Sequence, residues 1–315
     1  MVGATGVYIA LTTIFVYLGV LLSVAYFTLM ERKSLSSFGI RLGPDKTSFL
    51  GFAQPITDGV KLFMKEFVVP ANSASIVFLA IPSISLILCL LGWQVFPSFA
   101  VSSWASNDVL FFLVVSSLNA HIAIMSGWSS NSKYASIGGV RGFAQVISYE
   151  ICLSICLIVV VIISSSMSFF SIAESGWSVW WGFFWFPVVL LWLTVCLAEA
   201  NRAPFDLVEA ESELVSGFNT EYSAGGFALL FIAEYGMILL LCSVTVFSFF
   251  QNPDMLNVAG LCWAFSKVMF LVFFFVWSRS ALPRLRYDFL MMACWSSLLP
   301  FILGVYCLIF FVSKF

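Results

Sequence analysis

The sequence predicts an all-α integral membrane protein, and three observations predict it. Of the 315 residues, 61% are hydrophobic and only 10% are charged, whereas a soluble domain has about 25% charged residues. The mean hydropathy is +1.04. Apolar stretches of about 20 residues, the length at which a helix crosses the hydrocarbon of a bilayer, recur along the chain. We therefore expect residues 1–315 to form a single membrane domain.

Eight apolar stretches are expected to be membrane-spanning helices. In chain order they cover about residues 6–30, 75–96, 107–127, 142–168, 180–200, 222–250, 258–279 and 287–312. The first stretch lacks a basic segment and a small-residue cleavage site, so we interpret it as a retained helix and not as a signal peptide.

The basic residues indicate how the chain is oriented. The loops after the first, third, fifth and seventh stretches hold 12 of the 14 Lys and Arg residues. Basic loops stay on the cytoplasmic or matrix side of a membrane. These loops are therefore expected on the inner side, and an even number of spans then places both termini on the other side.

Charge and cysteine usage exclude two classes of function. A net charge of −2 does not suit a basic nucleic-acid-binding protein. The eight cysteines lie inside apolar runs and form no Cys-x-x-Cys pair, whereas iron–sulfur ligation uses clustered thiolates. We expect small buried side chains there, no metal site, and redox centres only in other chains.

The first inner loop contains an amphipathic segment, expected to be a helix over about residues 55–66 that starts at Pro55. Apolar and charged residues take opposite faces of this helix: Ile56, Val60 and Phe63 against Asp58, Lys61 and Lys65. A two-faced helix beside a membrane lies in the interface plane. It is either a simple surface anchor or the frame of a lateral opening for a lipid-soluble ligand.

The third inner loop, residues 201–221, is acidic. Arg202 is its only base, and its carboxylates are Asp206, Glu209, Glu211, Glu213 and Glu221. If Pro204 opens a helical turn, Asp206, Glu209 and Glu213 share one face. Carboxylates this close repel one another and share protons, which favours a proton-handling site over a merely solvated loop.

Ionisable residues also lie inside the predicted spans. Glu150, Glu199, Glu234 and Lys267 are far from the ends of their stretches or at an inner end. Such groups are costly in a bilayer and typically mark proton or ion paths. The alternative is a static ion pair between Glu234 and Lys267. His121 is expected to be satisfied within its own helix.

Motifs in all four inner loops then point to one family. They are Glu31-Arg32-Lys33, Arg41-x-Gly43-Pro44, Gln54-Pro55-x-x-Asp58, Ser126-Gly127-Trp128, Ser148-Tyr149-Glu150, Asn201-Arg202-x-Pro204-Phe205-Asp206, Ala233-Glu234-Tyr235 and Pro283-Arg284-x-Arg286-Tyr287-Asp288. In this order they resemble the family of complex I membrane subunits called NADH–ubiquinone oxidoreductase chain 1. The sequence departs from the family pattern at Leu42, Asp45, around Thr47–Leu50 and at Phe67, which affects the expected shape of the mouth of the ubiquinone tunnel that the family forms.

The resemblance implies a role for most of the polar residues. A ubiquinone tunnel would be bordered by Glu31, Arg32, Arg41, Asp58, Lys61 and Phe231. An acidic proton path would include Tyr149, Glu150, Glu199, Asp206, Glu209, Glu211, Glu213, Glu221, Tyr222 and Glu234. Structural and interface roles would belong to Arg141, Arg202, Lys267, Arg279, Arg284, Arg286 and Asp288.

The resemblance also implies an enzyme complex, proton-translocating NADH:ubiquinone reductase. Its flavin and iron–sulfur clusters would belong to partner subunits, and ubiquinone would be the substrate. The expected partners are the hydrophilic-arm quinone-site subunits, small and antiporter-like membrane subunits, and lipids, with no nucleic acid. The expected location is the mitochondrial inner membrane, or alternatively a bacterial plasma membrane. A membrane anchor of a proton-pumping hydrogenase and a stand-alone proton-coupled transporter are the rival interpretations.

Overall fold

The structure, a computed structural model, describes residues 2–96, 107–175, 186–208, 217–250 and 258–312. Within these ranges the secondary structure is entirely helical and contains no strand. The all-α expectation is confirmed. Seven helical segments of the described chain are long and apolar enough to cross a membrane.

The spanning helices follow the predicted order. They are α1 (Val2–Phe38), α3 (Ser75–Gly92), α4 (Asp108–Ser129), α5 (Lys133–Ser164), α10 (Ala224–Phe249), α11 (Val258–Ala281) and a last span of three parts, α12 (Tyr287–Met292), a π-helical segment (Ala293–Leu298) and α13 (Leu299–Val312). A shorter apolar helix, α8 (Phe186–Glu199), lies where the fifth span was expected. Residues 180–185 of that expected span lie outside the described ranges.

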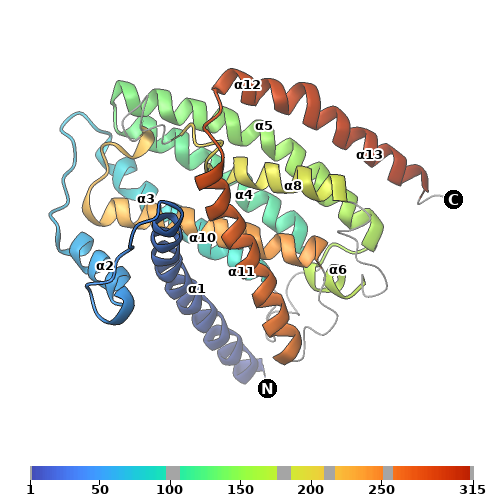
Figure 1. The fold of residues 1–315 in the computed structure, drawn as a ribbon, viewed down its shortest axis with the longest axis horizontal. Coiled ribbons are helices and arrows are strands. Elements are labelled where there is room, and N and C mark those ends of the chain that lie inside the picture. Colours follow the sequence, from blue (N-terminus) through green and yellow to red (C-terminus); the bar gives the residue numbers. More distant parts are fainter. Residues whose placement is uncertain (1, 97–106, 176–185, 209–216, 251–257, 313–315) are drawn as a thin grey trace.

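Shorter elements connect the spans. They are α2 (Gln54–Met64), α6 (Phe169–Ser175) and three 3-10 turns at Phe49–Gly51, Trp93–Val95 and Gly217–Asn219. Pro55 occupies the first turn of α2, where the missing amide proton costs nothing. The apolar residues Ile56, Val60 and Phe63 of α2 are exposed, as suits a helix lying in the membrane interface. In Figure 1, α2 lies at the left edge, beside the long helices.

Two helices extend further than hydropathy predicts. α1 continues through the charged residues 31–33 and stops only before Gly39, because the Glu31 carboxylate pairs with Arg202, which follows α8, and with Arg279 of α11. α5 begins at Lys133 and not near residue 142. Its early glycines, which resemble a loop in sequence, let α5 approach α4: a Cβ on Gly139 would lie 2.7 Å from the Ala123 oxygen.

The central helix of the bundle is α10. Every residue from Tyr235 to Phe249 is buried. Trp93 at the end of α3 donates to the Gly236 oxygen at 3.2 Å, so α3 and α10 are fixed side by side. α1 and α11 lie on one side of α10, and the last span packs against α5 on another (Figure 1). This arrangement brings the C-terminal parts of α1, α8 and α11 together with Tyr235 in the middle of α10.

Candidate functional site

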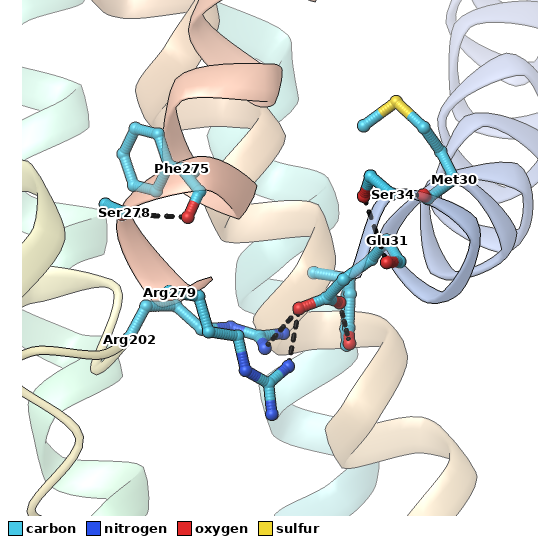
Figure 2. Close-up of polar contacts among 8 residues, drawn as sticks. Met30, Glu31, Ser34, Arg202, Phe275, Ser278 and Arg279 are labelled. Carbon is cyan, nitrogen blue, oxygen red and sulfur yellow. Dashed lines mark hydrogen bonds and ion pairs between the residues drawn. The ribbon is translucent and has the colours of Figure 1, made fainter. Parts of the chain in front are cut away.

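A charged cluster lies where four segments meet. The Glu31 side chain on α1 is only 6% exposed, and its Oε1 accepts from Arg279 Nη1 at 2.5 Å. The same oxygen accepts from Arg202 Nη1 at 3.2 Å. Glu31 Oε2 accepts from the Tyr235 hydroxyl of α10. Figure 2 shows both guanidinium groups pointing at this single carboxylate.

The four segments place these groups for identifiable reasons. Glu31 is there because α1 continues beyond its apolar stretch, and Arg279 lies in the last turn of α11, where a cation suits the helix dipole. Arg202 follows the end of α8 and lies 4.3 Å from the centre of the Tyr235 ring, close enough for a cation–π contact. The cluster contains one carboxylate and two guanidinium groups, so it carries an excess positive charge.

A small polar cavity adjoins the cluster. Its volume is about 60 Å³, which is enough for ordered water, since a cavity needs about 10–15 Å³ to admit one water molecule. Arg202 belongs both to the cavity wall and to the Glu31 cluster. The other polar residues of the wall are Ser85, Asn119, Glu199, Asn201 and Glu234.

Several buried oxygens near this cavity have no hydrogen-bond partner among the described residues. Both carboxyl oxygens of Glu199 and the side-chain oxygen of Asn201 are in this state, as are one oxygen each of Asp206 and Asn219. A buried polar group without a partner costs about 1–3 kcal/mol. Two buried carboxyl oxygens beside a water-sized cavity are a chemical environment suited to ordered water and to proton exchange.

Further ion pairs join the ends of the helices near this cluster. Arg32 of α1 contacts Asp58 of α2 at 2.6 Å, with both side chains substantially exposed. Arg284, before the last span, contacts Asp206 at 3.0 Å, and the neighbouring Leu285 amide donates to the Pro204 oxygen at 3.1 Å. The first pair links α1 to the interfacial helix, and the second links the last span to the start of the acidic loop.

An aromatic face runs along α10 towards the cluster. The Phe227 and Phe231 rings have centroids 5.0 Å apart, and Phe231 and Tyr235 have centroids 5.2 Å apart. Phe63 of α2 contacts this helix near Gly225. Aromatic rings at this spacing attract one another, so the three rings form a continuous face on α10.

A wide apolar groove lies on another side of α1. Its volume is about 1190 Å³, and its walls are residues of α1, α10 and α11 together with Phe52, Trp93 and Phe96. Tyr26, Met30 and Lys33 belong to this wall, whereas Arg32 points away from it because a helix turns about 100° per residue. None of the six residues predicted for a tunnel is among the groove's described lining residues.

Comparison with known proteins shows the family. Residues 11–310 match the family described as NADH dehydrogenase. The chain is also 45% identical over 287 residues to NADH-ubiquinone oxidoreductase chain 1 of Heterololigo bleekeri, covering 90% of this chain and 91% of the relative.

The chain belongs to the NADH dehydrogenase family. Relatives from other organisms support this family assignment. NADH-ubiquinone oxidoreductase chain 1 of Anopheles gambiae is 45% identical over 295 residues, which are 93% of this chain and 91% of the relative. The protein of the same name from Chondrus crispus is 42% identical over 294 residues, which are 90% of each chain. The resemblance inferred from the motifs is confirmed.

The residues predicted for a tunnel in this family do not form one cluster. Glu31 belongs to the charged cluster, and Phe231 to the aromatic face of α10. Arg32 and Asp58 pair with each other. Arg41 and Lys61 are exposed. The predicted set therefore lies on α1, α2 and the N-terminal half of α10, with Arg41 just after α1.

Six of the residues predicted for the acidic path fall into three groups. Glu199 and Glu234 both line the polar cavity. Glu150 lies within electrostatic range of Glu199 and of His121, and the His121 ring also contacts the Ser117 oxygen at 2.9 Å. The third group, Glu209, Glu211 and Glu213, lies outside the described residues.

Other path residues have structural contacts. The Tyr149 hydroxyl donates to the Leu290 oxygen of α12 at 3.1 Å, so it points to the last span and not to the cavity. Tyr222 stacks on Phe78 with ring centroids 4.2 Å apart, and its hydroxyl is 3.4 Å from that of Ser129. Glu221 beside it is half-buried.

Two expectations require correction. The described residues after Pro204 form turns and no helix, because Leu207 and Val208 turn into the core and are buried. The alternative pairing of Glu234 with Lys267 is excluded as well. Lys267 Nζ donates to the Phe250 oxygen at 2.5 Å, and Phe250 is roughly 24 Å along α10 from Glu234 at about 1.5 Å per residue.

The residues predicted to have structural or interface roles lie in different environments. Arg202 and Arg279 complete the Glu31 cluster, and Arg284 binds Asp206. Arg286 and Asp288 are exposed around the start of α12, and Arg141 is half-buried on α5.

Sequence reasoning missed Tyr235, Asn119 and Asn201 as members of the site. Tyr235 follows an intramembrane acid directly in the chain, and this adjacency is the signal that could have identified it. Asn119 in the middle of α4 and Asn201 just after α8 have no comparable signal, because a single amide in the sequence does not indicate a site.

Proposed function

We propose that this chain is a membrane subunit of respiratory complex I, the enzyme named by its relatives. In this role it borders the ubiquinone access tunnel and carries an acidic path that couples quinone reduction to proton translocation. It is a multi-pass protein of the mitochondrial inner membrane with both termini on the intermembrane-space side. Flavin and iron–sulfur clusters belong to partner subunits, and ubiquinone is the substrate.

The observation that carries this proposal is the double contact of Arg202. Its guanidinium group binds Glu31 at 3.2 Å and also lines the cavity that contains Glu199 and Glu234. A change in charge near Glu31 therefore acts on the buried carboxyl groups of Glu199 and Glu234 through the side chain of Arg202. In a low-dielectric interior such an effect is much stronger than in water.

The tunnel wall is formed by α1, α2 and the inner half of α10. The aromatic face of Phe227, Phe231 and Tyr235 leads towards Glu31, and the Arg32–Asp58 pair keeps α2 against α1. Exposed apolar side chains of α2 face the membrane, from which a lipid-soluble quinone enters. The neighbouring hydrophilic-arm subunits close the tunnel at its head.

Coupling follows from competition for Arg202. Charge that appears in the tunnel during quinone reduction changes how strongly Glu31 holds Arg202. The guanidinium group then stabilises the charged forms of the Glu199 and Glu234 carboxylates more strongly or less strongly. The protons that these carboxylates share move through cavity water as a result. The protons continue by Glu150 and the acidic loop towards the antiporter-like subunits. The bistable element that such coupling requires is Arg202 between two sets of carboxylates.

The experiment compares Arg202→Gln with Arg279→Gln in the complex reconstituted into liposomes. Both variants remove one guanidinium group from Glu31, but only Arg202 lines the cavity. We expect Arg202→Gln to lower the number of protons moved per quinone reduced, and Arg279→Gln to leave this ratio at its native value. A native ratio in Arg202→Gln would contradict the coupling role.

The tunnel is tested separately with a photoreactive ubiquinone analogue. We expect labelling in residues 31–66 or on the aromatic face of α10, and labelling confined to other subunits would contradict the tunnel. Purification in mild detergent tests the assembly itself. Flavin and iron–sulfur proteins should accompany the chain, whereas a nickel–iron protein or a solitary active chain would favour the hydrogenase anchor or the transporter.

A further inference from the structure

Two thiols from distant spans are in direct contact. Cys152 Sγ on α5 lies 3.8 Å from Cys294 Sγ in the last span, and both residues are fully buried. The Cys294 thiol also donates to the Ser148 oxygen at 3.3 Å. Because that bond uses the hydrogen of Cys294, the Cys152 thiol donates to the Cys294 sulfur. The two sulfur atoms therefore face each other.

The helix of the last span changes its winding at this contact. α12 ends at Met292, and a π-helical segment starts at Ala293, one residue before Cys294. A π turn holds an extra residue and is frequent at functional sites. The wider turn thus coincides with the residue whose thiol reaches α5.

The contact lies in a peripheral interface. The last span packs mainly against α5, and its outward side chains Phe289, Met292 and Trp295 are exposed. The thiol pair is flanked by the hydrogen bond from Tyr149 to the Leu290 oxygen. A small movement of the last span away from α5 gives a reagent access to the pair.

We propose that Cys152 and Cys294 are a redox-sensitive dithiol that closes to a disulfide with neutral two-electron oxidants, such as hydrogen peroxide or an azodicarboxamide. With peroxide, one thiol takes an oxygen atom to become a sulfenic acid and releases one water. The second sulfur attacks the sulfenic sulfur, the S–S bond forms, and the hydroxyl leaves with the remaining thiol proton as a second water. A disulfide of about 2.05 Å requires the sulfurs to approach by about 1.8 Å.

Closing this bond would join the last span to α5. α5 also carries Glu150, and the Tyr149–Leu290 hydrogen bond lies beside the thiols. The disulfide therefore prevents separation of the two helices at the level of the π-helical segment. This inference is independent of quinone binding and of the proposed coupling.

The test uses native membranes that contain the chain, treated with diamide as the azodicarboxamide. Free thiols are then alkylated after unfolding, and peptides are analysed by mass spectrometry without reduction. We expect a linked pair of the Cys152 and Cys294 peptides and a joint loss of both from the alkylated pool, reversed by dithiothreitol. Cys262 and Cys307, which are single and exposed, serve as internal controls for reagent access.

Variants make the assignment specific. Cys156→Ser, one turn from Cys152 on the same helix, should leave the linked peptides unchanged, whereas Cys152→Ser and Cys294→Ser should each abolish them. If Cys152 and Cys294 are both recovered as free alkylated thiols while Cys262 or Cys307 has reacted, the proposal is wrong. Linkage of Cys294 to Cys156 in the native sequence would overturn it as well.

Discussion

Lys267 of α11 donates to the main-chain oxygen of Phe250, where α10 ends, at a distance of 2.5 Å. The last carbonyls of a helix have no partner within the helix, and a cation there also suits the helix dipole. The Trp263 ring lies 5.5 Å from the same amine. A lysine inside a span thus closes a helix end, although its depth suggested an ion path.

Replacing Lys267 by Met should therefore affect stability and not pumping. We expect a loss of about 1 kcal/mol in the free energy of unfolding, the typical size of a cation at a helix C-terminus. Thermal unfolding of the purified complex measures the loss, and Lys133→Met at the exposed start of α5 is the control. Loss of proton translocation in a fully assembled Lys267→Met complex would show that Lys267 belongs to the proton path.

Glu31→Gln should destabilise the inner end of the bundle strongly. The change leaves Arg202 and Arg279 beside an uncharged amide, and removing one partner of a buried ion pair costs about 3–5 kcal/mol. Asp58→Asn breaks the exposed pair with Arg32 and should cost at most about 1 kcal/mol. Midpoints of thermal unfolding compare the two, and equal shifts would contradict a special role for the buried cluster.

Glu199→Gln should uncouple the enzyme without harming the fold. The glutamine keeps the shape of a side chain whose two oxygens have no described protein partner, but it cannot exchange a proton. We expect proton translocation to fall by about a hundredfold, as when a positioned proton-transfer group is removed. Proton uptake into proteoliposomes measures this, with Glu174→Gln at an exposed position of α6 as the control. Unchanged proton uptake in Glu199→Gln would show that the polar cavity is not part of the proton path.

Gly127→Ala should force α4 and α5 apart. A Cβ at Gly127 would lie 2.5 Å from the main-chain oxygen of Ala135, and backbone cannot move aside as a flexible side chain can. Overpacking of this kind costs about 1–3 kcal/mol, so less assembled complex should appear on native gels. Gly19→Ala on α1, which has nothing within 4 Å of the new Cβ, should assemble normally; equal losses in both variants would contradict the steric argument.

Hydropathy predicts the helices well because a span must satisfy its backbone internally and be apolar over most of its length. It fails where a helix continues into polar sequence. Glu31 looked like the start of a loop, yet it is a helical residue whose charge is balanced by Arg202 and Arg279. Those partners are 171 and 248 residues away, and no local pattern can reveal a contact of that range.

The candidate site was predictable in its residue types and only partly in its geometry. An intramembrane acid indicates function wherever it occurs, so Glu199 and Glu234 could be selected from sequence. Tyr149 was selected with them but bonds to the last span. Whether an acid or a tyrosine faces a cavity or a neighbouring helix depends on helix rotation in the assembled bundle, which a single sequence with few polar residues does not determine.

The Glu31 cluster also has a consequence for biogenesis. During synthesis the Glu31 carboxylate enters the membrane first and acquires its partners in chain order: Arg202 after 171 residues, Tyr235 after 204 and Arg279 after 248. At about 5–20 residues per second, the last partner follows roughly 12–50 s after the carboxylate. In a chain truncated before α11, the Glu31 carboxylate lacks Arg279 and is only partly neutralised. The finished cluster therefore distinguishes a complete subunit from a fragment before assembly begins.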